Sequence, residues 1–172
     1  MNYNDKLTWQ LFAEGKTKGV FQLESNLGKS WAKKLAPTNI EELSALIAII
    51  RPGTLKAYVD GKSMTQHYVD RKHGREEVTY LHPALEEILK STYGVLVYQE
   101  QSMRIAQKIA GFNLQEADVL RKAIGKKKAD LMNEVKKSFI AGAERVGTVS
   151  KEEAEQIFGW IEKSSRYAFN KS

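Results

Sequence analysis

Residues 113–128 read NLQEADVLRKAIGKKK, and this segment carries the clearest structural pattern in the chain. Asn113 and Glu116 form a capping box, in which each side chain bonds a backbone N–H at the start of a helix. The apolar residues that follow recur at helical spacing and are predicted to face the core. They are Leu114, Ala117, Leu120 and Ile124. Gly125 is predicted to close this helix.

The outer face of the same helix is predicted to be basic. Arg121 and Lys122 lie three and four residues after Asp118, so the three side chains share one side of the helix. Lys126, Lys127 and Lys128 follow at the junction with the next helix, where free backbone N–H groups and the helix dipole favour an anion.

Most of the net charge of the chain lies in this region. Residues 121–137 hold seven basic side chains against Asp130 and Glu134, so the window carries +5 of the total +6. One interpretation is a phosphate or polyphosphate site. The alternative is a solvated face on which Asp118 simply pairs with Arg121 or Lys122, a contact of small energetic value.

Helical periodicity continues in the rest of the second half. A stripe over residues 103–110 ends at Gly111, and a long helix is expected over residues 129–146. Ser150 and Glu153 form a further capping box for the last helix. The residues expected to face inward from the last two helices are Leu131, Val135, Phe139, Ala143, Ile157, Phe158 and Ile161.

The first half shows weaker helices and two strand candidates. Helices are expected after Asp5, over residues 27–35 and 63–72, and after a capping box of Thr38 and Glu41. The inward residues of the first three apolar stripes are expected to be Leu7, Leu11, Phe12, Leu27, Trp31, Leu35, Ile40, Leu43, Leu46, Ile47 and Ile50. Alternation favours short strands at 19–24 and 95–98. The fold class is therefore mainly α, a multi-helical domain with up to two short strands.

Composition excludes several kinds of chemistry. The chain has 172 residues, 42% of them hydrophobic and 28% charged, which suits a globular domain with a core. It has no cysteine, and its three histidines have no metal-ligand spacing, so we predict neither a metal site nor a catalytic residue. No apolar run is long enough to cross a bilayer and the N-terminus does not resemble a signal peptide, so we expect a cytoplasmic protein that does not bind membranes.

Six short sequence motifs occur along the chain in an order that indicates a protein family. They are GVFQLES at 19–25, RPG at 51–53, RKHG at 71–74, TYGVLVYQEQ at 92–101, EADVLRKAIGKKK at 116–128 and FNKS at 169–172. Together they resemble the alpha subunit of bacterial DNA polymerase III, of the DnaE type in the C family of polymerases. The resemblance covers nearly the whole chain and implies the fingers region, which closes over the incoming deoxynucleoside triphosphate and the template strand.

The resemblance also implies a set of site residues. Those expected to bind the nucleotide triphosphate are Arg121, Lys122, Asn170 and Lys171. From their charge and their place in the sequence, rather than from the resemblance, Arg51, Lys126, Lys127 and Lys128 are expected to bind DNA or other phosphates. Lys122 stands where the family usually has a second arginine, which keeps the charge and loses the bidentate fork. We expect one fingers-type domain over 1–172, with 1–18 as a lead-in and the chain ending inside a motif.

The expected partners follow from the same resemblance. They are the DNA template and primer, deoxynucleoside triphosphates, the remaining polymerase domains and other replisome subunits. The family's Mg²⁺-binding aspartates lie in the palm, so no cofactor is expected in this segment and it should not polymerise DNA by itself. The alternative is a stand-alone helical module that binds nucleic acid or a protein partner without serving polymerisation.

Overall fold

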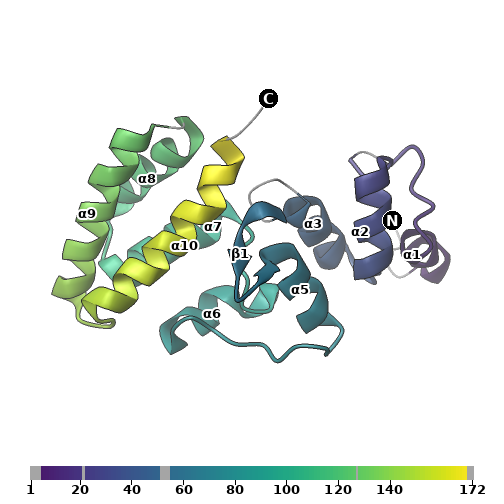
Figure 1. Ribbon diagram of the computed structural model, residues 1–172, viewed down its shortest axis with the longest axis horizontal. Helices are drawn as coiled ribbons and strands as arrows, with labels where there is room; N and C mark the ends of the chain where they lie inside the picture. Colours follow the sequence, from purple (N-terminus) through teal and green to yellow (C-terminus); the bar gives the residue numbers. More distant parts are fainter. Residues whose placement is uncertain (1–4, 21, 51–54, 127, 170–172) are drawn as a thin grey trace. The chain divides into compact units, whose positions relative to one another are not determined.

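The computed structural model describes residues 5–20, 22–50, 55–126 and 128–169, with only the backbone described for Lys126 and 165–169. It divides into two units, Met1–Glu77 and Val78–Ser172 (Figure 1). Helices account for most of the described residues, which confirms the mainly α fold class. The expectation of one domain over 1–172 stays a prediction.

Four helices in the described part of the first unit each begin at a side chain that caps them. The helices are α1 (Lys6–Ala13), α2 (Asn26–Leu35), α3 (Ile40–Ile49) and α5 (Met64–Lys72). Their capping side chains, which accept a backbone N–H in the first turn, belong to Asp5, Ser25, Asn39 and Ser63. The predicted capping box of Thr38 and Glu41 is wrong by one residue, because Asn39 Oδ1 accepts from the N–H of Glu42 at 2.8 Å.

Fewer apolar residues are buried in the core of the first unit than the apolar stripes of its helices predicted. Phe12, Trp31, Leu35 and Leu46 are buried as expected. Four residues expected inside are exposed, namely Leu7, Leu11, Leu27 and Ile40, and Leu43, Ile47 and Ile50 are only partly buried. Because α1, α2 and α3 bury only part of their circumference, the side of each helix that meets a neighbour decides burial, and periodicity alone does not identify that side.

The described strands of the first unit lie outside both segments that were predicted as strands. Strand β1 (Tyr58–Val59) pairs antiparallel with β2 (Lys62–Ser63), with Tyr58 opposite Ser63. Asp60 and Gly61 join them with φ of 50° and 81°, the left-handed pair that a tight hairpin requires. The strand predicted at 19–24 is wrong, because Gly19 and Gln22 are left-handed and the described residues of this segment, 19–20 and 22–24, form turns and bends.

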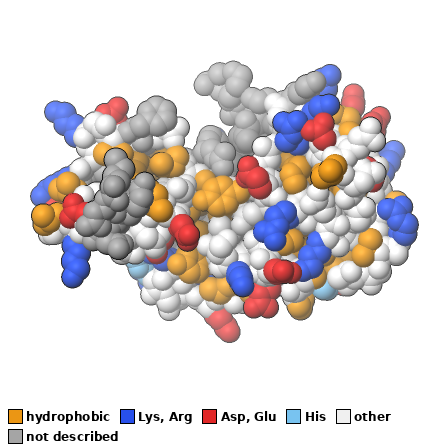
Figure 2. Space-filling model, turned by 180° about the vertical axis from the view of Figure 1, so that it is seen from behind, with side chains coloured by type: hydrophobic (Ala, Val, Ile, Leu, Met, Phe, Trp, Pro, Cys, Tyr) orange, Lys and Arg blue, Asp and Glu red, His pale blue; other side chains and the backbone are white. Residues whose placement is uncertain are grey.

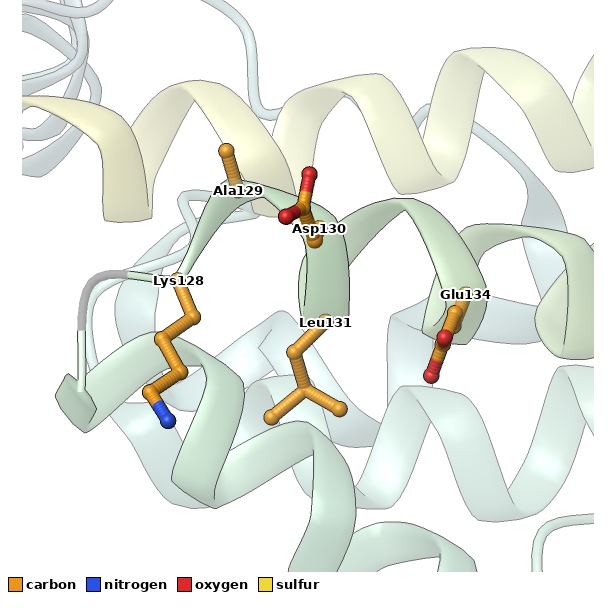
Figure 3. Close-up of a pocket in the computed structure, with 5 residues that line it drawn as sticks. All are labelled: Lys128, Ala129, Asp130, Leu131 and Glu134. Carbon is orange, nitrogen blue, oxygen red and sulfur yellow. The ribbon is translucent and has the colours of Figure 1, made fainter.

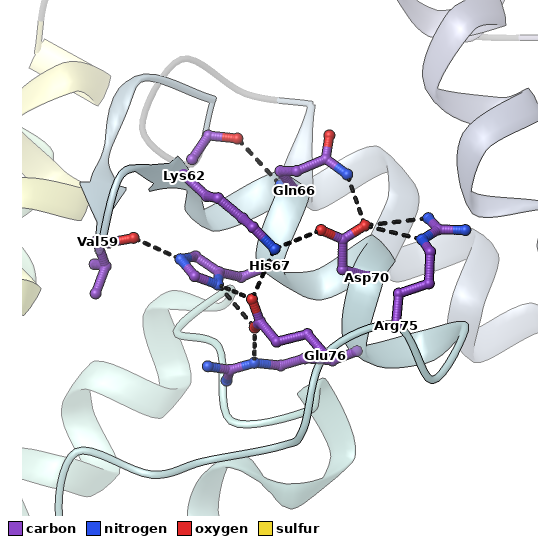
Figure 4. A network of polar contacts seen from close by, with 9 residues as sticks. Val59, Lys62, Gln66, His67, Asp70, Arg75 and Glu76 are labelled. Atoms are coloured by element: carbon purple, nitrogen blue, oxygen red, sulfur yellow. Dashed lines mark hydrogen bonds and ion pairs between the residues drawn. The ribbon is translucent and has the colours of Figure 1, made fainter.

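A polar network ties this hairpin to α5 and to the segment that follows it (Figure 4). His67 Nε2 lies 2.6 Å from the carbonyl oxygen of Val59, and its Nδ1 lies 2.8 and 2.9 Å from the two carboxylate oxygens of Glu76. Both ring nitrogens thus lie within hydrogen-bonding distance of oxygen atoms. Lys62 Nζ bridges Asp70 at 2.8 Å and Glu76 at 3.0 Å.

The second unit is a helical bundle arranged around α9 (Figure 1). Its elements are η1 (Pro83–Leu85), α6 (Glu86–Leu89), η2 (Lys90–Thr92), α7 (Gln99–Ala110), α8 (Leu114–Lys126), α9 (Ala129–Val146) and α10 (Lys151–Phe169). Helix α9 packs on α7, α8 and α10. Phe139 lies at the centre, with its ring centroid 6.1 Å from that of Phe112 and 5.3 Å from that of Phe158. Aromatic pairs at this spacing are favourable.

Most predictions for this unit are confirmed. Helix α9 spans the predicted residues, Ser150 and Glu153 form their capping box, and Ile157, Phe158 and Ile161 are buried. Leu131 is only partly buried, and Met132 takes the core position. Residues 95–98 are described as an irregular segment, so the strand predicted there is wrong. A side chain takes up part of its backbone hydrogen bonding, since Gln101 Oε1 accepts the N–H groups of Val97 and Tyr98, both at 2.9 Å.

Candidate phosphate-binding site on helix α8

Helix α8 presents the candidate site because its opposite side is anchored in the bundle. The N–H of Glu116 donates to Asn113 Oδ1 at 2.8 Å and Glu116 Oε1 accepts from the N–H of Asn113 at 3.3 Å, which confirms the capping box. Ala117, Leu120 and Ala123 are buried against the unit. This anchoring fixes which side of α8 faces solvent.

Two details of the predicted helix are wrong. Leu114 is 82% exposed and Ile124 only partly buried, because Ala117, Leu120 and Ala123 make the buried stripe. Leu114 lies on the same side as Asp118 and Arg121, at helical spacing of four and seven residues. Gly125 does not close the helix either, since α8 continues to Lys126 and Gly125 has no positive φ among the described residues.

The structure brings Arg121 and Lys122 together around one carboxylate. Asp118 Oδ1 accepts from Arg121 Nη2 at 2.6 Å and from Nε at 3.1 Å, and Asp118 Oδ2 lies 3.1 Å from Lys122 Nζ. Hydrogen bonds from Arg121 and then from Lys122 hold the pKa of Asp118 below its usual value. The two cations keep 58% and 51% of their side chains exposed.

Both interpretations of this face therefore have support. The pairing that a plain solvated face would show is present, and exposed pairs of this kind add little stability. Yet the cations are adjacent and exposed, and the shared carboxylate leaves the cluster with one net positive charge. The face can still attract a polyanion.

Lys128 lies at the other side of the helix junction. It is exposed and forms the N-cap position of α9 without a side-chain capping hydrogen bond. It borders a shallow depression of about 540 Å³ that Asp130, Leu131 and Glu134 also line. In Figure 3 the side chains of Lys128, Leu131 and Glu134 point to one side of α9 and that of Asp130 to the other. The two carboxylates make this depression a weaker anion site than the α8 face.

Several predicted site residues lie outside the described residues. They are Arg51, Lys127, Asn170 and Lys171, together with the side chain of Lys126. Their assignments stay predictions. The structure thus places three of the eight predicted residues and unites two of them, Arg121 and Lys122.

A second group of basic side chains on the surface was not predicted from the sequence. Lys108 Nζ lies 3.0 Å from Glu87 Oε2, and Lys108, Arg104 and Lys90 together lower the pKa of Glu87, with Lys108 contributing most. These residues come from α6, η2 and α7, so no single run of sequence marks the group. The four-residue spacing of Arg104 and Lys108 on the polar side of α7 was the available sign.

The distribution of charged side chains over the surface shows the same pairing of basic and acidic residues. On the face shown in Figure 2, basic side chains lie beside acidic ones, and the described residues form no unbroken basic field there. Within the described parts of the chain, no three histidine or acidic residues gather in a way that could hold a metal ion. In the same parts, no helix combines the length and the apolar character needed to span a bilayer.

Comparison with known proteins gives the family. A family model described as the bacterial DNA polymerase III alpha subunit finger domain matches residues 1–147, which include the whole of α8 and α9. The chain belongs to this finger-domain family. The resemblance inferred from the six motifs is thereby confirmed.

Curated relatives of this finger-domain chain are named DNA polymerase III subunit alpha. The protein of Aquifex aeolicus is 48% identical, that of Halalkalibacterium halodurans 46% and that of Escherichia coli strain K12 42%. Each match covers 98% of this chain and 14% of the relative. The chain therefore spans about one seventh of the length of these relatives.

Proposed function

We propose that this chain serves as the fingers segment of a bacterial replicative DNA polymerase and that Arg121 and Lys122 bind the phosphates of the incoming deoxynucleoside triphosphate. The observation that supports this most is the adjacent, exposed pair of cations on α8. It lies within the residues matched by the finger-domain family. DNA template, primer and the rest of the polymerase are the proposed partners.

The two side chains would contribute differently to the bound triphosphate. Arg121 offers a planar fork that can hold two phosphate oxygens, whereas Lys122 acts as a point charge. Held in place, both would stabilise the negative charge that develops on the leaving pyrophosphate. The residues proposed to contact DNA phosphates are Arg51, Lys126, Lys127 and Lys128. Those proposed to contact the triphosphate in addition to Arg121 and Lys122 are Asn170 and Lys171.

The bond-forming step would take place outside this chain. Two Mg²⁺ ions would supply it in the palm region of the polymerase, and the residues of this chain would bind and orient. Mixed with primed template, Mg²⁺ and nucleotides, the 172-residue chain alone should leave the primer at its original length. Extension by the purified chain would contradict this division of roles.

The binding role can be tested on the chain itself. Titration with dATP, followed by calorimetry and by amide shifts in NMR, should show binding at α8. Arg121→Ala and Lys122→Ala should each weaken it about five- to tenfold, because each removes charged hydrogen bonds worth roughly 1 kcal/mol at an exposed site. Lys18→Ala removes an exposed cation of the first unit as a charge control. Equal losses in all three variants would contradict a specific site.

A further inference from the structure

Among the described residues, Asp118 is the one acidic side chain bonded to both Arg121 and Lys122. We propose that Asp118 is a positioning residue that holds the head groups of Arg121 and Lys122 side by side for a triphosphate. This inference rests on the proposed function of those two residues. It assigns a carboxylate a constructive role in a site for anions, where charge alone predicts that it would hinder binding.

The geometry leaves the site open while Asp118 remains bonded. A guanidinium has five N–H groups and an ammonium has three. Asp118 Oδ1 takes Nε and one hydrogen of Nη2 from Arg121, and Oδ2 takes one hydrogen from Lys122 Nζ. Three N–H groups of Arg121 and two of Lys122 remain for phosphate oxygens. A triphosphate therefore does not need to displace the carboxylate.

Two effects of Asp118 oppose each other, and its fixed position decides between them. Its charge repels phosphate, but this repulsion is screened because all three side chains are substantially exposed. Its hydrogen bonds restrict two long side chains that would otherwise lose much rotamer freedom when a ligand binds. The capping box of Asn113 and Glu116 fixes the helix on which this restriction acts.

Two neutral replacements separate position from charge. Asn in place of Asp118 keeps an Oδ1 that can accept both bonds from Arg121, whereas it loses the ion pair with Lys122. Ala loses both contacts. Because Asp118→Asn and Asp118→Ala remove the same charge, any difference between them reports positioning. Glu155→Gln, at an exposed position of α10, controls for the loss of one negative charge.

The experiment measures binding of inorganic tripolyphosphate to the 172-residue chain by calorimetry, with the Arg121 Nε–H signal followed by NMR. We expect Asp118→Asn to bind at least as tightly as the unmodified chain and Asp118→Ala at least threefold more weakly than Asp118→Asn. The Arg121 signal should stay protected from exchange in the Asn variant and lose that protection in the Ala variant.

The outcomes that contradict the two proposals differ. Equal or tighter binding by Asp118→Ala relative to Asp118→Asn would overturn the positioning role and leave Arg121 and Lys122 as ligands. Failure of the unmodified chain to bind tripolyphosphate, or binding that survives Arg121→Ala and Lys122→Ala, would overturn the proposed function and this inference with it. Circular dichroism melts of all variants show whether the fold is retained.

Discussion

Two carboxylates of this chain have different roles because their surroundings differ in burial and in hydrogen bonding. Glu76 keeps only 21% of its side chain exposed, within a network that includes His67, Lys62 and Arg71. Asp118 keeps 41% exposed and pairs with Arg121 and Lys122, whose side chains are themselves more than half exposed. The first carboxylate therefore holds the fold together, whereas the second contributes little to stability and is available to organise a binding face.

Removing the charge of Glu76 should destabilise the first unit. Glu76→Gln leaves Lys62, His67 and Arg71 without their shared anion, and we expect the free energy of unfolding to fall by roughly 2 kcal/mol. Urea denaturation measures this change. Glu14→Gln, which affects an exposed pair with Lys16, is the control and should have little effect. A similar small effect in both variants would contradict a structural role for the network.

The same carboxylate predicts the response to acid. Burial alone would raise the pKa of Glu76, but hydrogen bonds from His67, Lys62 and Arg71 lower it from 4.5 to about 2. Glu76 therefore contributes stability above pH 4.5 that is lost as the pH falls towards 2, at most about 3 kcal/mol. Unfolding free energies measured across this range should fall less steeply in Glu76→Gln. Parallel curves would contradict the assignment.

At the scale of elements, helix starts were predicted better than strands. The capping boxes at Asn113 and Ser150 are purely local, since each needs only two side chains three residues apart. The strand predicted at 19–24 failed because left-handed residues, which the alternation of side chains does not reveal, fold that segment into turns. The Asp60–Gly61 hairpin carried a recognisable turn pair, yet two-residue strands leave no periodicity to detect.

The candidate site could be predicted only in part for a related reason. Arg121 and Lys122 are neighbours on one helix, so spacing alone places them together. The group around Glu87 draws on three elements, and only tertiary packing joins them. Likewise, the exposure of Leu114 depends on which side of α8 meets the bundle.

The start of α8 offers a test of how local capping supports the site. Asn113→Ala removes an acceptor for the N–H of Glu116, and we expect a loss of about 1 kcal/mol in unfolding free energy. Triphosphate binding should weaken slightly because the first turn frays. Gln115→Ala, an exposed change in the same turn, is the control. If chemical denaturation shows no difference between the two variants, the cap is not stabilising.

The crossing of α7 and α9 depends on one glycine. A Cβ added at Gly142 would lie 2.1 Å from the carbonyl oxygen of Ala110, which is backbone and cannot move aside cheaply. Gly142→Ala should therefore lower the unfolding free energy by about 2 kcal/mol or more, measured by urea denaturation. Gly159→Ala, in α10 with open space around it, should stabilise by up to about 1 kcal/mol. The opposite order would contradict the close approach.

For the whole molecule, the net charge of +6 predicts DNA binding that depends on salt. Each phosphate contact contributes a slope of about −0.9 to the plot of log K against log salt concentration. Replacing Lys126, Lys127 and Lys128 by Ala should make the slope shallower by about 2 to 3, as measured by fluorescence anisotropy. Replacing Lys18, Lys29 and Lys56 removes equal charge from the first unit and should change it less. Equal changes would contradict a localised contact.

The contact at Gly142 also has a mechanical consequence. At Gly142 the backbone of α9 comes so close to the carbonyl group of Ala110 that a side chain in place of the glycine would not fit, so we expect that α9 cannot slide along α7 unless the two helices first separate there. A force applied along α9 would then reach α7 through this contact. We therefore expect α7 and α9 to keep this contact and to move together in a rearrangement of the bundle.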